Sequence, residues 1–207
     1  SFEAKMAATS QAHDEARHFY VMRDYLKHIG VEPQPLPKNT SKALNFVLNT
    51  NSLPKKLLGM QLMVEPIAIT IFKLVIQSDV DPVLCNLLRL YEKDEARHIA
   101  LGVKFLPELI QNMNHYEVFN LFVWQLRLML IEIDGLKELR NDFKNLGFEV
   151  DDVYNLAESK QMEAAILMGE ELNLKYPPWN AMKKVVKFKK HLKLSDNSSI
   201  LDMVNYF

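Results

Sequence analysis

The sequence contains little cysteine and glycine and carries almost no net charge. A single cysteine, Cys85, among 207 residues excludes a disulfide framework and a four-cysteine iron or zinc site. The formal net charge of −1 gives no reason to expect nucleic acid or an anionic membrane as a partner. Six glycines beside 48% hydrophobic residues favour a soluble, helix-rich globular protein. With one cysteine, we expect a reducing, cytoplasmic setting.

The chain also lacks a long hydrophobic run free of polar residues. The most apolar stretch, residues 57–76, contains Gln61, Glu65, Pro66 and Lys73, so we interpret it as a buried helix rather than a membrane span. No signal peptide is visible. The first residues have the pattern of a helix already under way, and we expect the natural protein to begin earlier.

Apolar residues recur at helical spacing, and no strand-like alternation of useful length is found, which predicts an all-α fold. We expect helices over residues 1–29, 41–48, 54–77, 82–112, 116–144 and about 151–176, with a bend near Pro107. A basic segment, Lys183–Lys193, follows. Such a segment is usually a solvated helix face, although it could dock an acidic carrier or an electron donor.

One pentapeptide occurs twice. Asp-Glu-Ala-Arg-His at Asp14–His18 is repeated at Asp94–His98, and no third copy exists, which excludes a solenoid. A Glu and a His three residues apart share one face of a helix, so both can reach one metal ion. Two such helices facing each other would supply two carboxylates and two imidazoles.

A further glutamate, Glu65, lies in the apolar helix between the two copies. A carboxylate buried there needs a compensating partner, and two adjacent metal ions need shared carboxylates. Taken alone, a Glu-x-x-His is usually a solvated pair and Glu65 could pair with an arginine. Together, the repeat and Glu65 favour a dinuclear metal site. The predicted ligands are Glu15, His18, Glu65, Glu95 and His98.

The nine residues 94–102, Asp-Glu-Ala-Arg-His-Ile-Ala-Leu-Gly, resemble the fourth-helix motif of ribonucleotide reductase small subunits, their ligand-binding oxidase relatives and acyl-carrier-protein desaturases. The resemblance covers residues 1–112. It implies a single ferritin-like domain over 1–207, a four-helix bundle with additional C-terminal helices, that holds two iron ions or a Mn/Fe pair.

The resemblance also implies roles for the neighbours of the ligands. Asp94 would orient His18, and Asp14 would orient His98, since ligand histidines usually give their second N–H to an oxygen. Arg17 and Arg97 would pair with acids and hold the helices together, or lie at the surface.

Two departures from the family pattern bear on the ligand set. The family has a first-helix acid further before Glu15 than this chain begins, so that ligand is missing or replaced. Glu132, in the apolar run 126–133, is the best internal candidate. The position of the radical tyrosine in many reductase subunits is Met22 here, which disfavours a radical-storing subunit.

Two more features concern the surroundings of the ligands. Pro66 follows Glu65 where relatives often carry glycine, and proline would bend or bulge the helix at that ligand. Tyr91 and Glu92 lie one turn before Glu95. Glu92 is a candidate extra ligand or proton donor, and Tyr91 a candidate member of the catalytic site.

By resemblance, the chain is an O2-dependent di-iron oxidase or oxygenase. Its substrate would be a small acyl, aromatic or amine compound, and its partners O2 and an electron-donor protein, with no nucleic acid or membrane. We expect a homodimer. The alternative is an iron-handling ferritin or rubrerythrin relative, a ferroxidase or peroxidase, but a rubrerythrin with its rubredoxin domain needs four cysteines and a storage ferritin is a shorter bundle. A metal-free structural relative is the third possibility.

Overall fold

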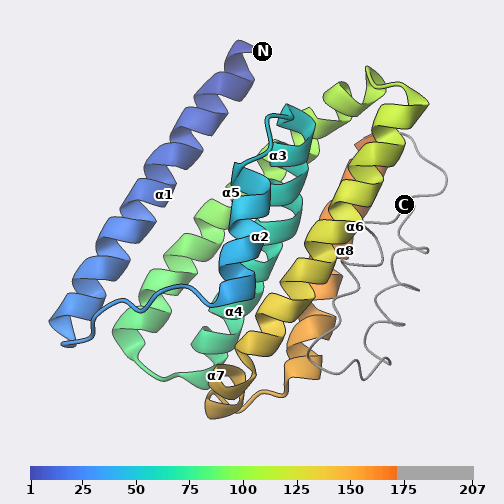
Figure 1. Cartoon of the computed structure of the whole chain (residues 1–207). Helices are drawn as coiled ribbons and strands as arrows, with labels where there is room; N and C mark the ends of the chain where they lie inside the picture. The colour runs from blue at the N-terminus through green and yellow to red at the C-terminus, as the bar shows by residue number, and fades with distance from the viewer. Residues whose placement is uncertain (172–207) are drawn as a thin grey trace.

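The computed structural model describes residues 1–171, and the segment Lys183–Lys193 lies outside them. The described chain is all-helical, as predicted, and no strand occurs in residues 1–171 (Figure 1). The elements are α1 (Phe2–His28), α2 (Lys38–Leu48), α3 (Leu53–Gly59), the π-helix η1 (Met60–Val64), α4 (Glu65–Ser78), α5 (Pro82–Gln111), α6 (His115–Glu138), α7 (Arg140–Asn145) and α8 (Val150–Glu171).

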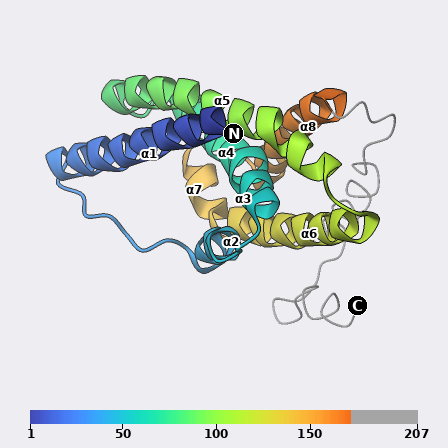
Figure 2. The same cartoon turned by 90° about the horizontal axis from the view of Figure 1, so that it is seen from above.

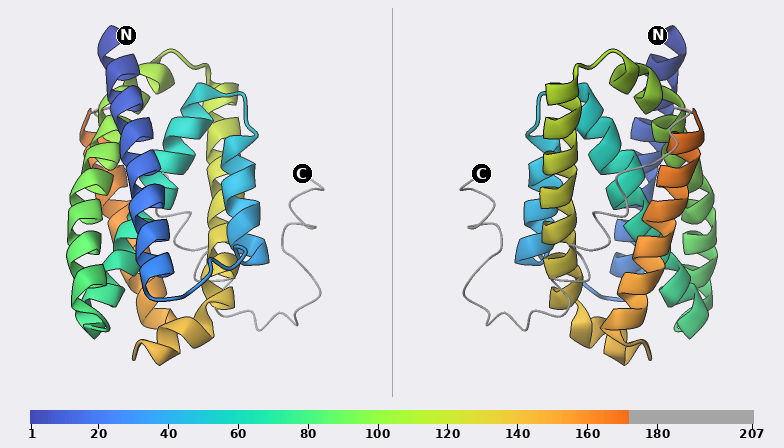
Figure 3. Two further views of the ribbon diagram at one scale, coloured as in Figure 1. Left: turned by 90° about the vertical axis from the view of Figure 1, so that its left-hand side faces the viewer. Right: turned by 90° about the vertical axis from the view of Figure 1, so that its right-hand side faces the viewer.

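The three consecutive elements α3, η1 and α4 form one central rod. On one side of the rod α1 and α5 lie next to each other, and on the other side α2 packs along α6 (Figures 2 and 3). Helix α8 contacts both α4 and α5. The core between these helices is made of large aliphatic side chains such as Leu62, Met63, Leu128 and Ile131.

Local signals in the sequence explain most helix ends. The Asp81 side chain accepts a hydrogen bond from Leu84 N at the start of α5, and Pro82 occupies the first turn, where its missing N–H is no loss. Asn114 and Glu117 form a reciprocal capping box that begins α6. Helix α5 runs through Pro107 to Gln111.

The prediction of one helix over 116–144 is wrong, because the chain leaves the helix at Leu139 and starts α7 at Arg140. No glycine or proline marks this break. Leu139 has φ −86° and ψ 9°, and the short α7 that follows places Phe143 in the core at 2% exposure. Burial of this aromatic ring outweighs the continuing helical periodicity.

Within residues 1–171, Leu53–Ser78 is the one helix long and apolar enough to cross a membrane by length and composition, and half of its most apolar window is buried. It is also the central rod, and it carries Gln61 and Glu65 into the interior. A buried carboxylate on a central helix is typical of a core helix of a globular protein that has a polar interior site.

Candidate metal centre

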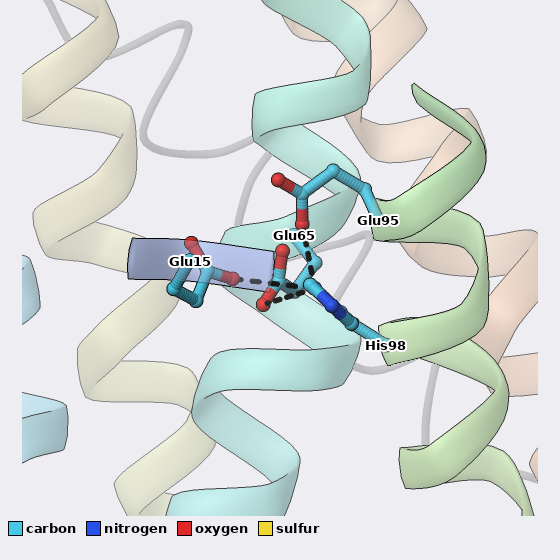
Figure 4. Close-up of side chains that lie close together, drawn as sticks. All are labelled: Glu15, Glu65, Glu95 and His98. Atoms are coloured by element: carbon cyan, nitrogen blue, oxygen red, sulfur yellow. Dashed lines mark hydrogen bonds and ion pairs between the residues drawn. The ribbon is translucent and has the colours of Figure 1, made fainter. Parts of the chain in front are cut away.

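Three helices bring four predicted ligands to one interior point. Glu15 comes from α1, Glu65 from the first residue of α4, and Glu95 and His98 from α5 (Figure 4). Each offers one ligand atom, and these four atoms lie within 4.8 Å of one another. Glu65, Glu95 and His98 are buried, while the Glu15 side chain is 46% exposed.

His98 is at the centre of this cluster. Its Nδ1 lies 3.1 Å from Glu95 Oε2, 3.2 Å from Glu15 Oε1 and 3.7 Å from Glu65 Oε1. Burial by itself opposes a charge on the ring, but hydrogen bonds to Glu15 and Glu95 outweigh it and raise the pKa of His98 to about 9. The converging carboxylates therefore stabilise a positive charge at this point, and in the metal-free protein the protonated His98 ring carries that charge.

His18 faces the same point from α1 without belonging to the group of four. Its Nδ1 lies 3.4 Å from Glu95 Oε1 and 3.8 Å from Glu15 Oε2. The Tyr91 ring stacks on the imidazole with centroids 4.0 Å apart, and the Tyr91 hydroxyl donates to the His18 carbonyl at 3.0 Å. Both Nδ1 atoms, of His18 and His98, are thus turned toward glutamate oxygens.

The other imidazole nitrogens face the two aspartates of the repeat. His18 Nε2 lies 2.9 Å from Asp94 Oδ2, a hydrogen bond that fixes the ring, and His98 Nε2 lies 3.5 Å from Asp14 Oδ2. These are the two pairs that the resemblance implies. His18 Nε2 is bonded to an acid, and His98 Nε2 faces one without a hydrogen-bond partner in the described chain, so Nδ1 is the nitrogen of each ring left to ligate a metal.

Two arginines cross-link the same aspartates. Arg17 contacts Asp94 at 2.6 Å and Asp14 at 3.0 Å, and Arg97 contacts Asp94 at 2.6 Å and Asp14 at 3.0 Å. Burial alone would raise the pKa of each aspartate, but the arginine and histidine partners hold the pKa of both below the ordinary value. The repeat therefore forms a reciprocal charged network between α1 and α5.

The central rod is distorted next to Glu65, as expected from the position of Pro66 in the sequence. Residues Met60–Val64 form a π-helix, in which the Glu65 N–H donates to Met60 O five residues earlier. Pro66 has no N–H to offer the preceding turn, so one α-helical hydrogen bond is lost there. A π-helix inserts an extra residue per turn and re-aims the side chains that follow it. Here the side chain that follows at once is Glu65.

Two glutamines that the sequence reading missed hold Glu65. Gln11 Nε2 donates to Glu65 Oε1 at 2.9 Å, and Gln61 Nε2 donates to Gln11 Oε1 at 2.9 Å. The central rod approaches α5 closely at this point, since a Cβ added at Gly102 would lie 2.6 Å from Gln61 Cβ. Gln11 lies one helical turn before Glu15, and Gln61 lies one turn before Glu65. This spacing is the sequence feature from which a role for both glutamines could have been predicted.

Two weaker candidates do not join the cluster. Glu92 pairs with Lys73 at 3.7 Å, away from the four converging ligand atoms. Glu132, proposed from the sequence as a substitute ligand, is bonded by Gln161 Nε2 at 3.1 Å, and Gln161 also donates to Met63 O. Glu132 lies on α6, on the other side of the central rod from α1, so its apolar surroundings reflect the core and not the metal site.

An apolar pocket of about 500 Å3 opens onto the cluster, a size ordinary for small-molecule sites. Glu15, His18, Glu65 and Glu95 are part of its lining, together with Tyr91. Most of the remaining lining is apolar: Phe19, Met22, Leu26, Pro33, Leu44, Met60, Val64, Ala68 and Phe72.

Comparison with known proteins identifies no relative, since no family model, no curated protein and no solved structure matches the chain. The chemistry of the cluster rests on its own geometry. Three carboxylates and an imidazole within 4.8 Å can hold a metal ion. Without a cation, the like charges of Glu65 and Glu95 would repel in a buried setting, so the donor set fits a metal better than it fits an empty site.

Proposed function

We propose that this centre holds two iron ions and that the protein is an O2-dependent oxidase or oxygenase of the ferritin-like superfamily. The support is the donor set: two Glu-x-x-His pairs on α1 and α5 and a single Glu65 on α4, all directed to one point. This is the ligand pattern of ferritin-like di-iron bundles, apart from one further carboxylate. A Mn/Fe pair has the same ligand preferences and is the variant of this proposal.

The residues of the chain have distinct roles in this proposal. Glu95 and Glu15 each lie near both histidines, so in this proposal they would be ligands common to both ions. His18 and His98 would each ligate through Nδ1 while an aspartate keeps the proton on Nε2. Bound iron supplies the redox chemistry with O2.

The apolar pocket beside the ligands is the observation that favours an oxidase over iron handling. An iron-storage or peroxide-consuming site requires access for small polar species, whereas this site is bordered by a space with the volume of an organic molecule. Side chains such as Met60, Val64 and Phe72 would exclude water from the reacting carbon. An electron-donor protein and a homodimer remain predictions of the resemblance.

Metal stoichiometry and oxygen reactivity test the proposal. Anaerobic titration with Fe(II) should load about two ions per chain, and O2 should then produce a transient visible absorption. Glu95→Ala should abolish both, while Glu92→Ala, one turn away and outside the cluster, is the matched control and should load normally. Normal iron loading by Glu95→Ala contradicts the site. Shell-sized particles on a sizing column would instead support iron storage.

A further inference from the structure

We propose that the substrate of this centre is a small apolar monocarboxylate, bound with its carboxylate at Arg23 and its hydrocarbon part along the pocket toward Glu15. This inference rests on the proposed function, because it names the substrate class of that site. It is carried by the distribution of charge along the pocket.

Arg23 is the one positively charged side chain among the residues that line the pocket. The other ionisable groups there are Tyr91 and the side chains of the candidate metal site. Unlike Arg17 and Arg97, which are held by aspartates, Arg23 has no hydrogen bond or ion pair to any residue in the described part of the chain. Its guanidinium is therefore available to an anionic ligand.

The position of Arg23 sets the direction of the ligand. Glu15, Phe19 and Arg23 follow at intervals of four along α1 and so lie on one ridge of the helix. Eight residues of helix separate Glu15 from Arg23, a rise of about 12 Å. Phe19, which also lines the pocket, stands between them. A carboxylate at Arg23 would direct its hydrocarbon chain past Phe19 toward the metal ligands.

The lining argues against other classes of small molecule. An amine would meet Arg23 as a like charge, and the pocket offers no acid outside the metal site to compensate. A dicarboxylate would bring a second charge among apolar side chains such as Met22, Leu44 and Val64, where no partner awaits it. A monocarboxylate keeps its charge at Arg23, which lies in contact with solvent, and places only its hydrocarbon chain against the apolar lining.

Calorimetric titration of the chain with sodium octanoate tests the inference, with octylamine and 1-octanol as ligands of the same length. We expect octanoate to bind the wild type about tenfold more tightly than either analogue, which is the magnitude of one charge-assisted hydrogen bond. Arg23→Gln should weaken octanoate binding by about tenfold and leave 1-octanol unchanged. Arg89→Gln, an exposed arginine of α5 that does not line the pocket, is the matched control and should bind as the wild type does.

A second variant tests whether the ligands bind in the pocket, independently of the charge of Arg23. Ala68→Trp should block all three ligands by filling the pocket, and circular dichroism would verify that this variant folds. Equal affinity of octanoate for the wild type and Arg23→Gln, or equal binding of octylamine and octanoate, would overturn the inference. Co(II) stoichiometry measured on the same samples distinguishes the two proposals. Metal binding without octanoate binding refutes the substrate class alone, and octanoate binding without metal refutes the proposed function alone.

Discussion

Glu132 is the buried acid whose substitution should have the clearest effect on stability. The Glu132 side chain extends from α6 and is buried in the protein core. Gln161 donates one hydrogen bond to its Oε2, and no described residue forms a hydrogen bond with its Oε1. Burial raises the pKa of Glu132 to about 8, against 4.5 for the ordinary side chain, although the bond from Gln161 works in the other direction. The folded protein therefore keeps this acid neutral at pH 7.

The sign of the pH dependence follows from proton counting. Between pH 4.5 and about 8 the folded state binds a proton at Glu132 that the unfolded state has lost, so the free energy of unfolding falls as the pH rises. The contribution is fully present below pH 4.5 and is lost as the pH passes through about 8. The separation of the two pKa values corresponds to roughly 5 kcal/mol at most, and to roughly 3 kcal/mol between pH 4.5 and 7.

Replacing Glu132 with glutamine removes the titrating carboxyl group and keeps the size and shape of the side chain. The new amide can still accept from Gln161, but its own N–H groups lack an acceptor, which we expect to destabilise the fold by about 1–3 kcal/mol at every pH. The wild type should lose stability relative to Glu132→Gln by roughly 3–5 kcal/mol between pH 5 and pH 9. The variant should thus be the less stable protein at pH 5 and the more stable one at pH 9.

Urea unfolding followed by circular dichroism at pH 5, 6, 7, 8 and 9 measures this difference. A chelator should be present, so that metal loading does not contribute, and the ionic strength should be constant. All other titrating groups are common to both proteins and cancel in the comparison. Glu158, a half-buried acid of α8, lines one small cavity together with Glu132, and Glu158→Gln controls for the loss of one negative charge. Parallel stability curves for the wild type and Glu132→Gln from pH 5 to pH 9 would refute the reasoning.

Two further substitutions probe the metal centre and its supports. Asp94→Asn should weaken Co(II) affinity by about 10- to 100-fold without unfolding the protein, because the charged acceptor that fixes the His18 ring becomes a neutral amide; unchanged affinity in a competition titration would show that the charge of this acceptor is not needed. Gly102→Ala should lower the free energy of unfolding by about 1–3 kcal/mol in urea, because the added Cβ would approach Gln61 Cβ to 2.6 Å. A neutral effect would mean that α5 and the central rod can separate at no cost.

The repeat made the convergence of these acidic and imidazole side chains predictable to a large extent. Duplicated Glu-x-x-His spacing places Glu15 and His18 on one helix face and Glu95 and His98 on another, and the apolar helix between them makes Glu65 the one carboxylate that must find a partner inside. The all-α class followed from helical periodicity alone. Local rules were sufficient for the helices and for the face that each Glu-x-x-His pair shares, because these conclusions concern residues within a few positions of one another.

Features that depend on tertiary packing could not be predicted from the sequence. The break at Leu139 has no local stop signal and follows from the burial of Phe143. The bond from Gln11 to Glu65 joins residues 54 positions apart, so the place of Gln11 one turn before Glu15 could mark it as a neighbour of the ligands but could not name Glu65 as its partner. Glu132 looked like a ligand because an acid in an apolar run needs an explanation, and the sequence could not tell that a glutamine on α8 supplies its partner.

The attachment of α1 has a consequence for how metal binding and folding depend on each other. The buried residues of α1 are Asp14 and His18, both polar, and the helix is otherwise partly or fully open to solvent. Polar cross-links, more than hydrophobic burial, thus hold this helix against α5. A cation shared by Glu15 and the ligands of the other two helices would tie α1 down as well, so loading the centre and docking the N-terminal helix would be thermodynamically linked events.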